Sequence, residues 1–383
     1  MILDVTFADV SIGSRNLREI STLIEQGYQV EVVSGPMCRK LPVNMSNIFV
    51  HEYCNIGLRK PRLYGIYCRL INQKRYLMQF NPDVVICHGY TTLLVAYLAF
   101  KSSKKRTKFI YHSHEFEMGR NSSRKRGRLL MLLVKKIEGF LMHRCSFSIV
   151  VNDSIADEVQ KIHNLKNRPI VIRSVPPLWK IDKTQCEKTR CELLKMIENP
   201  QNMVLMYHGM IMKGRGIEML LQVVEKNTQV CIIIMGNGKE EYLFKLKQMS
   251  NDLGISNRVL FYPSVPIEKL WMYIGAADVG MVTIPATTKS YYFMLPNKFF
   301  ENIQSETPVI CSNYPAIEKI VNQYNIGITC SPTNVDEINQ CIEKMRINKE
   351  FYNQCKANIK LAKLELCWEK EKNILIDAFR RLI

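Results

Sequence analysis

Short apolar runs alternate with longer mixed segments along most of the chain. In the first half the apolar runs fall at residues 2–7, 30–34, 83–87, 109–111 and 146–151, and in the second half at 204–207, 230–235, 259–262, 279–283 and 309–312. Apolar runs of this length predict buried strands, and the amphipathic segments between them predict helices, such as residues 14–26 before Gly27. Strands that alternate with helices in this way indicate parallel sheets and an α/β fold.

The alternation is interrupted once, around residues 173–179, where Pro176 and Pro177 predict a linker. A chain of 383 residues is too long for one ordinary hydrophobic core and fits two domains. We therefore predict one doubly wound domain over residues 1–178 and a second over residues 179–362. Doubly wound sheets bind ligands at the carboxyl ends of their strands, so a ligand is expected in the cleft between the two halves.

The most informative segment reads LPNKFFENIQSETPVI and spans residues 295–310. Pro296 suits the first position of a helix, because its missing N–H group needs no intrahelical partner there. Asn297 and Glu301 are four residues apart and share one face of the helix, whereas Phe299 marks the buried face. A carboxylate near the start of such a helix is suited to bind a pair of sugar hydroxyls. The alternative is a capped surface helix with no ligand.

Two glycine-containing turns follow predicted strands in the second half. The first carries Gly209, Lys213 and Arg215 and leads into a helix. Glycine lets backbone N–H groups approach a diphosphate, the helix start adds a favourable dipole, and the planar guanidinium of Arg215 can bind two phosphate oxygens. The second turn contains Gly236 and is either a nucleotide contact or a purely structural turn.

Taken in chain order, these motifs resemble glycosyltransferase family 4, whose members are retaining sugar transferases of the GT-B fold. The resemblance implies two Rossmann-like domains that face each other across a cleft, with residues 363–383 forming a helix that crosses back to the first domain. It also implies a nucleotide-diphosphate sugar as the donor substrate. It places Glu301 on the ribose hydroxyls and Arg215 on the diphosphate. The other donor-site residues that it implies are Gly13, Gly209, Lys213, Gly236, Val265, Asn297 and Lys298.

Four features qualify the roles that the resemblance implies. Many family members have a second glutamate eight residues before the ribose-binding one, but Phe293 stands there, so recognition of the sugar is unassigned. Glu306 replaces a glycine that is common in the family. The ammonium of Lys298 is predicted either to face the diphosphate or to pair with Glu301 or Asn302. No D-x-D motif follows a strand, so we expect the donor phosphates to be bound without a metal cofactor.

Polar residues also follow predicted strands in the first half, where the acceptor is expected. Gly13 lies in the first such turn and is either close to the donor phosphate or acceptor, or part of an ordinary helix cap. His112 and His114 resemble a family loop of the H-E type and are our candidates for catalysis, either as acid/base groups or as hydrogen-bonding groups that line the cleft. His88 is a third candidate. Because His112, His114 and Glu115 are so close along the chain, no metal site is predicted.

Basic charge is concentrated in the first half of the chain. Residues 1–180 carry 28 Lys and Arg against 13 Asp and Glu, and the net charge of the whole chain is +18. The two densest clusters are Lys101, Lys104, Lys105, Arg106 and Lys108, and then Arg120, Arg124, Lys125, Arg126 and Arg128. The second cluster runs into an apolar segment, which predicts either a helix on an anionic membrane surface or a solvated helix face. No nucleic-acid reader motif is visible, so no nucleic-acid partner is expected.

The remaining features concern the cellular compartment. Residues 1–4 do not resemble a signal peptide, and residues 82–100 contain Asp83, His88 and Gly89, which argues against a membrane span. Thirteen scattered cysteines without a C-x-x-C motif favour reduced thiols. We therefore expect a cytoplasmic protein that also binds peripherally to the inner face of the cell membrane.

The sequence thus predicts a retaining glycosyltransferase of hexosyltransferase type. Its donor would be a nucleotide-diphosphate sugar, its acceptor a lipid-linked saccharide or polysaccharide, and its role bacterial surface polysaccharide biosynthesis. Two alternatives remain open. One is a nucleotide-sugar epimerase of the same fold, and the other is a non-catalytic GT-B subunit that binds a partner or a polysaccharide.

Overall fold

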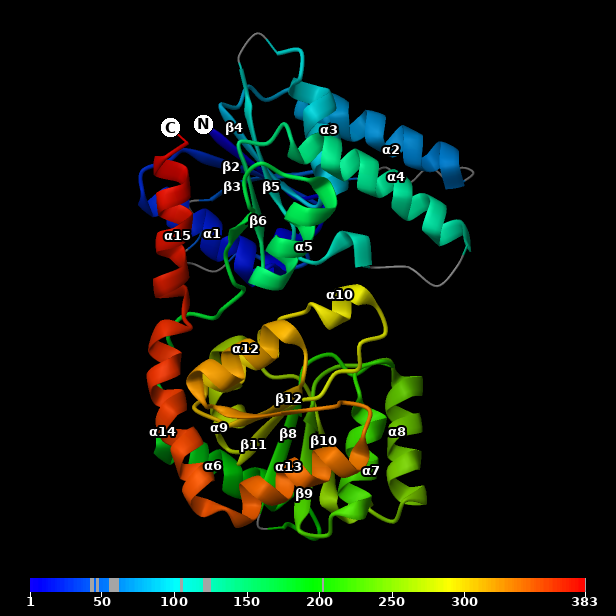
Figure 1. The fold of residues 1–383 in the computed structure, drawn as a ribbon, viewed down its shortest axis with the longest axis vertical. Helices are drawn as coiled ribbons and strands as arrows, with labels where there is room; N and C mark the ends of the chain where they lie inside the picture. The colour runs from blue at the N-terminus through cyan, green and yellow to red at the C-terminus, as the bar shows by residue number, and fades with distance from the viewer. Residues whose placement is uncertain are drawn as a thin grey trace. The chain divides into compact units, whose positions relative to one another are not determined.

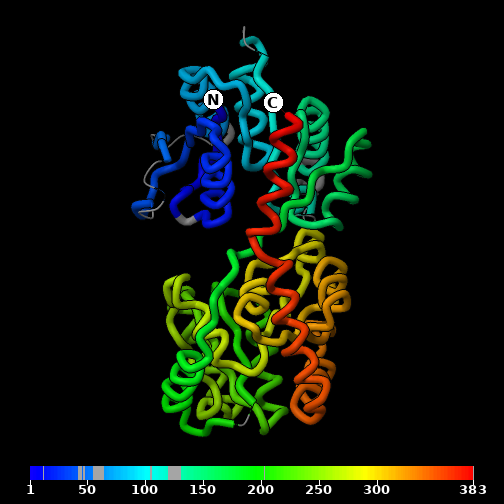
Figure 2. Tube along the Cα trace, turned by 90° about the vertical axis from the view of Figure 1, so that its left-hand side faces the viewer, coloured from blue at the N-terminus to red at the C-terminus, as the bar shows by residue number. Residues whose placement is uncertain are grey.

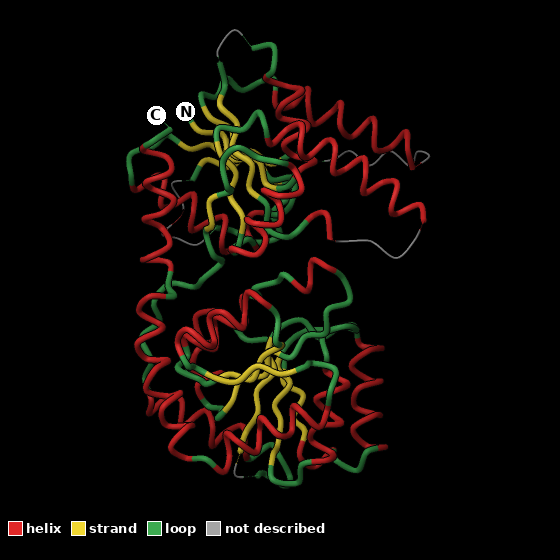
Figure 3. The backbone as a smooth tube through the Cα atoms, viewed as in Figure 1, coloured by secondary structure: helices red, strands yellow, loops and turns green. Residues whose placement is uncertain are grey.

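The computed structural model describes residues 1–41, 45, 48–54, 62–103, 106–119, 125–201 and 203–382. The chain divides into two compact units, one formed by Met1–Ser174 with Glu371–Ile383 and the other by Val175–Lys370. Each unit has a central sheet flanked by helices (Figures 1 and 3). The domain boundaries proposed from the sequence, after residues 178 and 362, stay a prediction.

The first unit is built on a seven-stranded parallel sheet with the order β3-β2-β1-β4-β5-β6-β7. Its strands are β1 (Ile2–Val5), β2 (Val30–Ser34), β3 (Phe49–Glu52), β4 (Val84–His88), β5 (Lys108–His112), β6 (Phe147–Val150) and β7 (Ile170–Val171). Its helices are α1 (Ser14–Glu25), α2 (Arg62–Leu77), α3 (Tyr90–Phe100), α4 (Lys125–Met142) and α5 (Asp153–His163), with short 3-10 turns at Val10–Ile12 and Glu117–Gly119.

The second unit contains a six-stranded parallel sheet with the order β10-β9-β8-β11-β12-β13. Its strands are β8 (Met203–His208), β9 (Val230–Met235), β10 (Val259–Tyr262), β11 (Val279–Val282), β12 (Val309–Ser312) and β13 (Gly327–Cys330). Its helices are α6 (Lys183–Leu194), α7 (Ile217–Lys226), α8 (Glu240–Asp252), α9 (Leu270–Gly275), α10 (Lys289–Tyr292), α11 (Asn297–Gln304), α12 (Pro315–Tyr324), α13 (Val335–Ile347) and α14 (Lys349–Glu365), with 3-10 turns at Ser256–Arg258 and Ile267–Lys269.

All ten strands predicted from the sequence are present, and their ends differ from the prediction by at most two residues. The sequence missed three strands, β3, β7 and β13. β3 and β7 lie at the edges of the first sheet and β13 at an edge of the second, where partial exposure dilutes the apolar signal. The predicted fold class is confirmed, because both halves are parallel, doubly wound α/β units. Each of the thirteen cysteines is a free thiol.

The core of the second unit shows why its central strands read as continuous apolar runs. Along β8, Met203, Leu205 and Tyr207 join one hydrophobic cluster, whereas Val204 and Met206 join the cluster on the opposite face. Successive side chains of a strand point to opposite faces, so a sheet covered by helices on both sides needs apolar residues at every position. The same logic predicts buried central strands in the first unit, where every residue of β1 and β4 is buried.

Polar side chains fix several helix ends. Asn152 begins α5 by accepting a hydrogen bond from the Ile155 amide, and Asp182 begins α6 in the same way through Gln185. At the C-terminus of α5, Asn164 adopts a left-handed conformation with φ of 50°, which asparagine tolerates better than most residues.

The last helix, α15 (Trp368–Arg380), carries the chain back to the first unit, as the resemblance implied. Its Phe379 packs edge-on against Phe147 of β6 and also contacts Tyr28. Arg173 donates hydrogen bonds from its backbone amide and its Nε to the Glu371 carboxylate. Figure 2 shows this terminal segment running along the first unit.

Candidate functional site

A pocket of about 340 Å³ lies at the carboxyl ends of β8 and β9 in the second unit. Its lining residues are His208, Gly209, Met210, Met235, Gly236, Asn237, Ser264, Val265, Leu270 and Glu301. Four of the residues predicted to bind the donor are among them, namely Gly209, Gly236, Val265 and Glu301. Ligands of doubly wound sheets bind at such strand ends, which makes this pocket the candidate site of the second unit.

Two glycines form one wall of this pocket through direct backbone contact. Gly209 has φ of 114° and Gly236 has φ of 155°, and a β-carbon placed on Gly236 would lie only 1.8 Å from the carbonyl oxygen of Gly209. The Gly209 amide donates a hydrogen bond to the Met235 carbonyl, and the Gly236 amide donates to that of Tyr262. Gly236 is therefore required by the turn and also lines the pocket, so its two predicted roles are compatible.

Glu301 enters the pocket from α11, which begins at Asn297. Pro296 is the extended N-cap of this helix and not its first helical residue, one position from the prediction, while Phe299 is fully buried as predicted. Oε2 of Glu301 lies 2.9 Å from Nε2 of His208, the last residue of β8. The free carboxylate oxygen of such a pair is suited to accept hydrogen bonds from vicinal hydroxyls.

Lys298 is buried beside this pair and carries an unpartnered ammonium group. Its Nζ has no hydrogen-bond partner among the described residues and lies 3.8 Å from the ring centre of Tyr207. Burial and the nearby Arg215 lower the pKa of Lys298 to about 7, against the opposing effect of Glu301. The alternative that the side chain of Lys298 pairs with Glu301 or Asn302 is wrong, because Nζ has no hydrogen-bond partner among the described residues. Asn302 donates only to the backbone carbonyl of Lys298, and Glu301 pairs with His208.

The other predicted contacts lie outside the pocket lining. Arg215 is half-buried, with its guanidinium 5.5 Å from the ring centre of Tyr291. The turn that carries it depends on Gly216, where a β-carbon would lie 2.3 Å from the carbonyl oxygen of Thr283. Lys213 and Asn297 are exposed to solvent. Their proposed roles in binding stay predictions.

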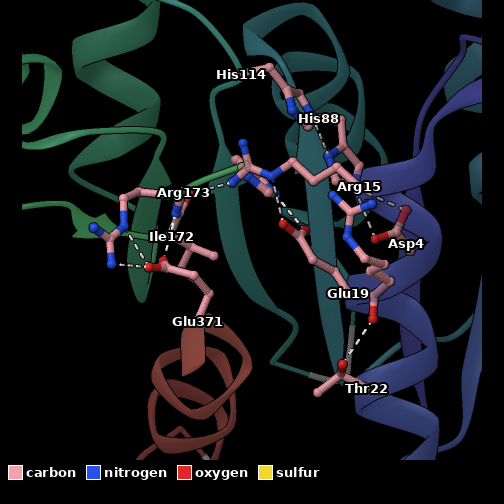
Figure 4. A network of polar contacts seen from close by, with 11 residues as sticks. Asp4, Arg15, Glu19, Thr22, His88, His114, Ile172, Arg173 and Glu371 are labelled. Carbon is pink, nitrogen blue, oxygen red and sulfur yellow. Dashed lines mark hydrogen bonds and ion pairs between the residues drawn. The ribbon is translucent and has the colours of Figure 1, made fainter. Parts of the chain in front are cut away.

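In the first unit, the predicted histidines lie in a buried polar cluster (Figure 4). Nε2 of His88 lies 3.0 Å from Oδ2 of Asp4, and its Nδ1 lies 2.9 Å from Nε2 of His114. Nδ1 of His112 lies 3.1 Å from a carboxylate oxygen of Glu19. His88 and His112 are directly paired in the register of β4 and β5, which explains why residues 24 positions apart meet.

Burial and charge act against each other in this cluster. Burial lowers the pKa of His112 to about 4, although Glu19 opposes this shift. Burial alone would lower the pKa of His88 as well, but the carboxylate of Asp4 outweighs it and the pKa is raised. The pKa of Glu19 is held well below its usual range, because His112 and Arg15 together outweigh the effect of burial.

Arg15 connects this cluster to the end of the sheet. It donates hydrogen bonds to Glu19, at 2.8 Å, and to the backbone carbonyl of Ile172, at 2.8 Å. Gly13 is the N-cap of α1 and has φ of −85°, so its backbone conformation does not require glycine. Its predicted approach to a donor or acceptor stays a prediction.

Sequence reasoning missed several members of both sites. His208, Asp4, Arg15 and Glu19 carry the key polar contacts, yet none was predicted. Two signals were present: Asp4 interrupts an apolar strand, and Arg15 and Glu19 are four residues apart on a predicted helix. In addition, the three side chains that lie close together are His88, His112 and His114. The prediction of no metal site was based on His112, His114 and Glu115, and Glu115 is exposed.

Comparison with known proteins supports both halves of this description. The family model for glycosyl transferases group 1 matches residues 195–362, and the model for glycosyltransferase family 4 matches residues 15–174. A comparison with curated proteins gives no match. Together the two models cover every strand of both sheets except β1.

Solved structures match the complete chain at low sequence identity. HepE of Anabaena, solved in complex with UDP-glucose, is 16% identical with a TM-score of 0.74, and the match covers 100% of this chain and 98% of that chain. Sucrose-phosphate synthase of Thermosynechococcus elongatus is 15% identical with a TM-score of 0.77 and the same coverage. The lipopolysaccharide outer core galactosyltransferase WaaB is 14% identical with a TM-score of 0.69, covering 100% and 99%.

The fold and the strand-end pocket thus define a protein of the GT-B class. Within that class, the chain belongs to the group 1 glycosyltransferases of family 4 type.

Proposed function

We propose that this glycosyltransferase takes its sugar from a nucleotide-diphosphate donor that binds in the pocket of the second unit. The observation that carries this proposal is the juxtaposition of Glu301, Lys298 and the Gly209–Gly236 wall. A carboxylate with a free oxygen suits ribose hydroxyls, and a buried ammonium without a partner suits an anion. The glycine backbone adds a surface that a phosphate can approach closely.

The remaining parts of the proposal follow from the family resemblance. Transfer proceeds with retention of configuration at the sugar, and the donor phosphates are bound by Arg215, Lys298 and backbone N–H groups without a metal ion. The acceptor is a lipid-linked saccharide or a growing polysaccharide of the bacterial surface, bound by the first unit, where His112 and His114 were proposed as catalytic. The structure of HepE with UDP-glucose supports a UDP-sugar as the first donor to test.

Calorimetric titration with UDP, GDP and ADP, followed by a donor screen that measures nucleotide release, tests this function. Arg215→Ala and Glu301→Ala should each weaken nucleotide binding by roughly tenfold to a hundredfold, the loss of one charge-assisted contact. Lys226→Ala is the matched control, because its exposed ion pair with Asp336 lies at the far end of α7. Absence of binding for all three nucleotides, or full activity of both site variants, would contradict the proposal.

The two alternative functions, an epimerase and a non-catalytic subunit, differ from a glycosyltransferase in the products that they form. Both family models describe glycosyl transferases, which favours transfer over epimerisation. An epimerase would convert the donor sugar without releasing nucleotide to an acceptor, and a non-catalytic subunit would bind nucleotide or saccharide without turnover. Analysis of the sugar nucleotide after incubation distinguishes all three functions.

We further propose that the first unit docks on an anionic membrane surface. Helices α2, α3 and α4 form one layer of this unit (Figure 1). The outer two helices expose Ile66 and Tyr67 on α2 and Leu132 and Leu133 on α4. Among the described residues, no helix is both long and apolar enough to cross a membrane. Of the two basic clusters, Lys104, Lys105, Arg120 and Arg124 lie outside the described residues.

Co-sedimentation with vesicles tests this docking. Binding should require anionic lipid, weaken at high salt and fall when Leu132 and Leu133 are both replaced by serine. Phe244→Ser is the control, since Phe244 is even more exposed than Leu132 and Leu133 but belongs to the second unit. Equal sedimentation with neutral vesicles, or no sedimentation at low salt, would contradict it.

A further inference from the structure

The ends of β4 and β5 in the first unit bring three imidazole groups together. His88 and His112 end these neighbouring strands, and His114 returns to them from the following loop. One ring nitrogen of each histidine lies within 4.8 Å of one ring nitrogen of each of the others. Figure 4 shows His88 and His114 facing each other above the sheet, with Asp4 and Glu19 on the side of the first strand and helix.

Carboxylates lie beside one ring nitrogen of His88 and one ring nitrogen of His112. Asp4 takes Nε2 of His88, which leaves Nδ1 pointing to His114. Nδ1 of His112 lies 3.1 Å from Oε2 of Glu19, and both ring nitrogens of His112 are buried without a hydrogen-bond partner in the described part of the chain. A carboxylate beside one ring nitrogen commonly supports a histidine that binds a metal through its other nitrogen, because the carboxylate fixes the tautomer and orients the ring.

The spacing of the rings fits a single small ion. The ring centres of His88 and His112 are 5.0 Å apart, those of His88 and His114 are 5.0 Å apart, and those of His112 and His114 are 4.6 Å apart. Three imidazoles on one tetrahedral ion, each at about 2.1 Å, have ring centres roughly 5 Å apart. The two nitrogens of His88 and His114 now lie 2.9 Å apart, so they need to separate by only a few tenths of an ångström to about 3.3 Å.

The charges around the rings favour a cation. The carboxylate of Asp4 lies beside His88 and that of Glu19 beside His112, and negative charge next to the rings favours a bound cation. His114 is half-buried whereas His88 and His112 are buried, so one side of the trio is open to an entering ion. Without an ion, the buried Nε2 of His112 remains unsatisfied, which costs about 1–3 kcal/mol.

We propose that His88, His112 and His114 form a binding site for one divalent transition-metal ion, with Zn²⁺ as the best fit. Three nitrogen ligands suit Zn²⁺, whereas Mg²⁺ and Ca²⁺ require oxygen ligands. Asp4 and Glu19 orient two of the ligands, and the fourth position faces the open side next to His114. The ion links the loop after β5, which carries His114, to the ends of β4 and β5, which carry His88 and His112. The proposal does not depend on nucleotide binding by the second unit. It replaces the catalytic role proposed for His112 and His114, because an imidazole nitrogen that binds a metal ion cannot accept or donate a proton.

Metal binding to the full-length chain tests this site. After treatment with a chelator, titration with Zn²⁺ should give one bound ion per chain, and Co²⁺ should give the intense visible absorption of a tetrahedral nitrogen site. His114→Ala should weaken binding at least a hundredfold. His51→Ala is the matched control, because this histidine also pairs with a carboxylate in the same unit but lies apart from the trio.

Two further readouts keep the test decisive. If His114→Ala does not fold, His114→Asn preserves most of the side-chain volume, and Zn²⁺ should raise the melting temperature of the wild type but not of this variant. The chain also has thirteen free thiols, so a thiolate-to-cobalt charge-transfer band would show binding to cysteine. That band in place of the nitrogen spectrum, or one-to-one binding that survives in both His114 variants, would overturn the proposal.

Discussion

The two units have the same strand order around their first strand, but different residues occupy the carboxyl ends of the strands. In both, the first strand of the unit lies between its second and its fourth, so β1 corresponds to β8 and β4 to β11. Glycines directly follow β8 and β9, and the space there is an open pocket beside the ammonium of Lys298, which has no partner among the described residues. At β1, β4 and β5 the space is filled by histidines, and carboxylates pair with two of them.

This difference teaches that side-chain size decides what a common scaffold can bind. Glycine has no side chain and so leaves room for a large anionic ligand to approach the backbone closely. Histidines that are oriented by carboxylates leave no such room but present nitrogens at the spacing of a metal ion. Four variants test the comparison, and they are considered from the largest expected effect to the smallest.

Gly236→Ala should have the largest effect. Its β-carbon would collide with the Gly209 carbonyl at 1.8 Å, and its φ of 155° is unfavourable for alanine, so we expect a loss of about 3 kcal/mol in unfolding free energy and of nucleotide binding. The three tryptophans all lie in the second unit, so their fluorescence during urea unfolding reports this change.

Gly254→Ala is the control for this experiment. Gly254 also has a positive φ, of 65°, but a β-carbon there meets no atom within 4 Å. We expect a cost of only about 1 kcal/mol and unchanged nucleotide binding. Equal losses in the two variants would mean that backbone conformation, and not the contact between the two pocket turns, is what matters.

Glu19→Gln tests the buried polar cluster at the strand ends of the first unit. The change removes the negative charge beside the buried guanidinium of Arg15, although the amide oxygen of glutamine can still accept a hydrogen bond, so we expect a loss of about 3 kcal/mol. Hydrogen exchange of the β4 and β5 amides measures it, because this unit contains no tryptophan.

The matched control is Glu31→Gln, which removes a carboxylate from a partly exposed pair with His51. This variant should cost less than about 1 kcal/mol, since solvent screens the pair. If the two variants accelerated exchange equally, the buried network around Glu19 would not be a special source of stability.

The sequence was sufficient for the scaffold but not for the partners within each site. Apolar runs predicted ten strands because central strands covered on both faces need an apolar residue at every position. Glu301, Gly209, Gly236 and Val265 could be assigned to one pocket because each belongs to a motif with a local pattern. The contact of His208 with Glu301 joins residues 93 positions apart, and no local pattern encodes it.

The same limit explains the histidines. Their positions after strands were visible, but their meeting depends on β4 and β5 being neighbours in register. Glu115 is close to His112 and His114 along the chain, whereas the pairing of β4 with β5 brings His88 close to them in space. Sheet order is a property of the whole unit and is not contained in any single segment.

The pH dependence of donor binding probes Lys298. In the free protein its pKa is about 7, and a bound diphosphate should raise that pKa, so the complex holds the proton more tightly than the free protein does. Affinity should therefore be constant below pH 7 and fall above it, by about tenfold between pH 6.5 and 8.5. A nucleotide sugar is the ligand of choice, because its diphosphate is ionised throughout this range.

Lys298→Met supplies the control, because it has no charge at any pH. Its affinity should be low and independent of pH, so that wild type and variant converge as the pH rises. A pH slope that persists in the variant would assign the titration to another group and leave Lys298 outside the phosphate site.

The smallest effect is expected at Glu306, directly after the C-terminus of α11. This residue has φ of 58°, a conformation that costs a non-glycine residue about 1 kcal/mol. The same cost explains why glycine is common at this position in glycosyltransferase family 4. Glu306→Gly relieves this strain but removes an ion pair with the buried Lys363, whose Nζ lies 3.1 Å from the carboxylate. The two effects should nearly cancel, with a net change below about 1 kcal/mol.

Repeating the substitution in a Lys363→Met background separates the two effects. Without the lysine there is no ion pair to lose, so Glu306→Gly should then stabilise the second unit by about 1 kcal/mol, measured by urea unfolding. If it remained neutral or destabilising in that background, the backbone at Glu306 would carry no strain. In that case the carboxylate would be kept for a reason other than Lys363. If Glu306→Gly does stabilise the Lys363→Met variant, the ion pair with Lys363 offsets the backbone strain at Glu306. That pair would then explain why a residue other than glycine is tolerated after α11, the helix that carries Glu301.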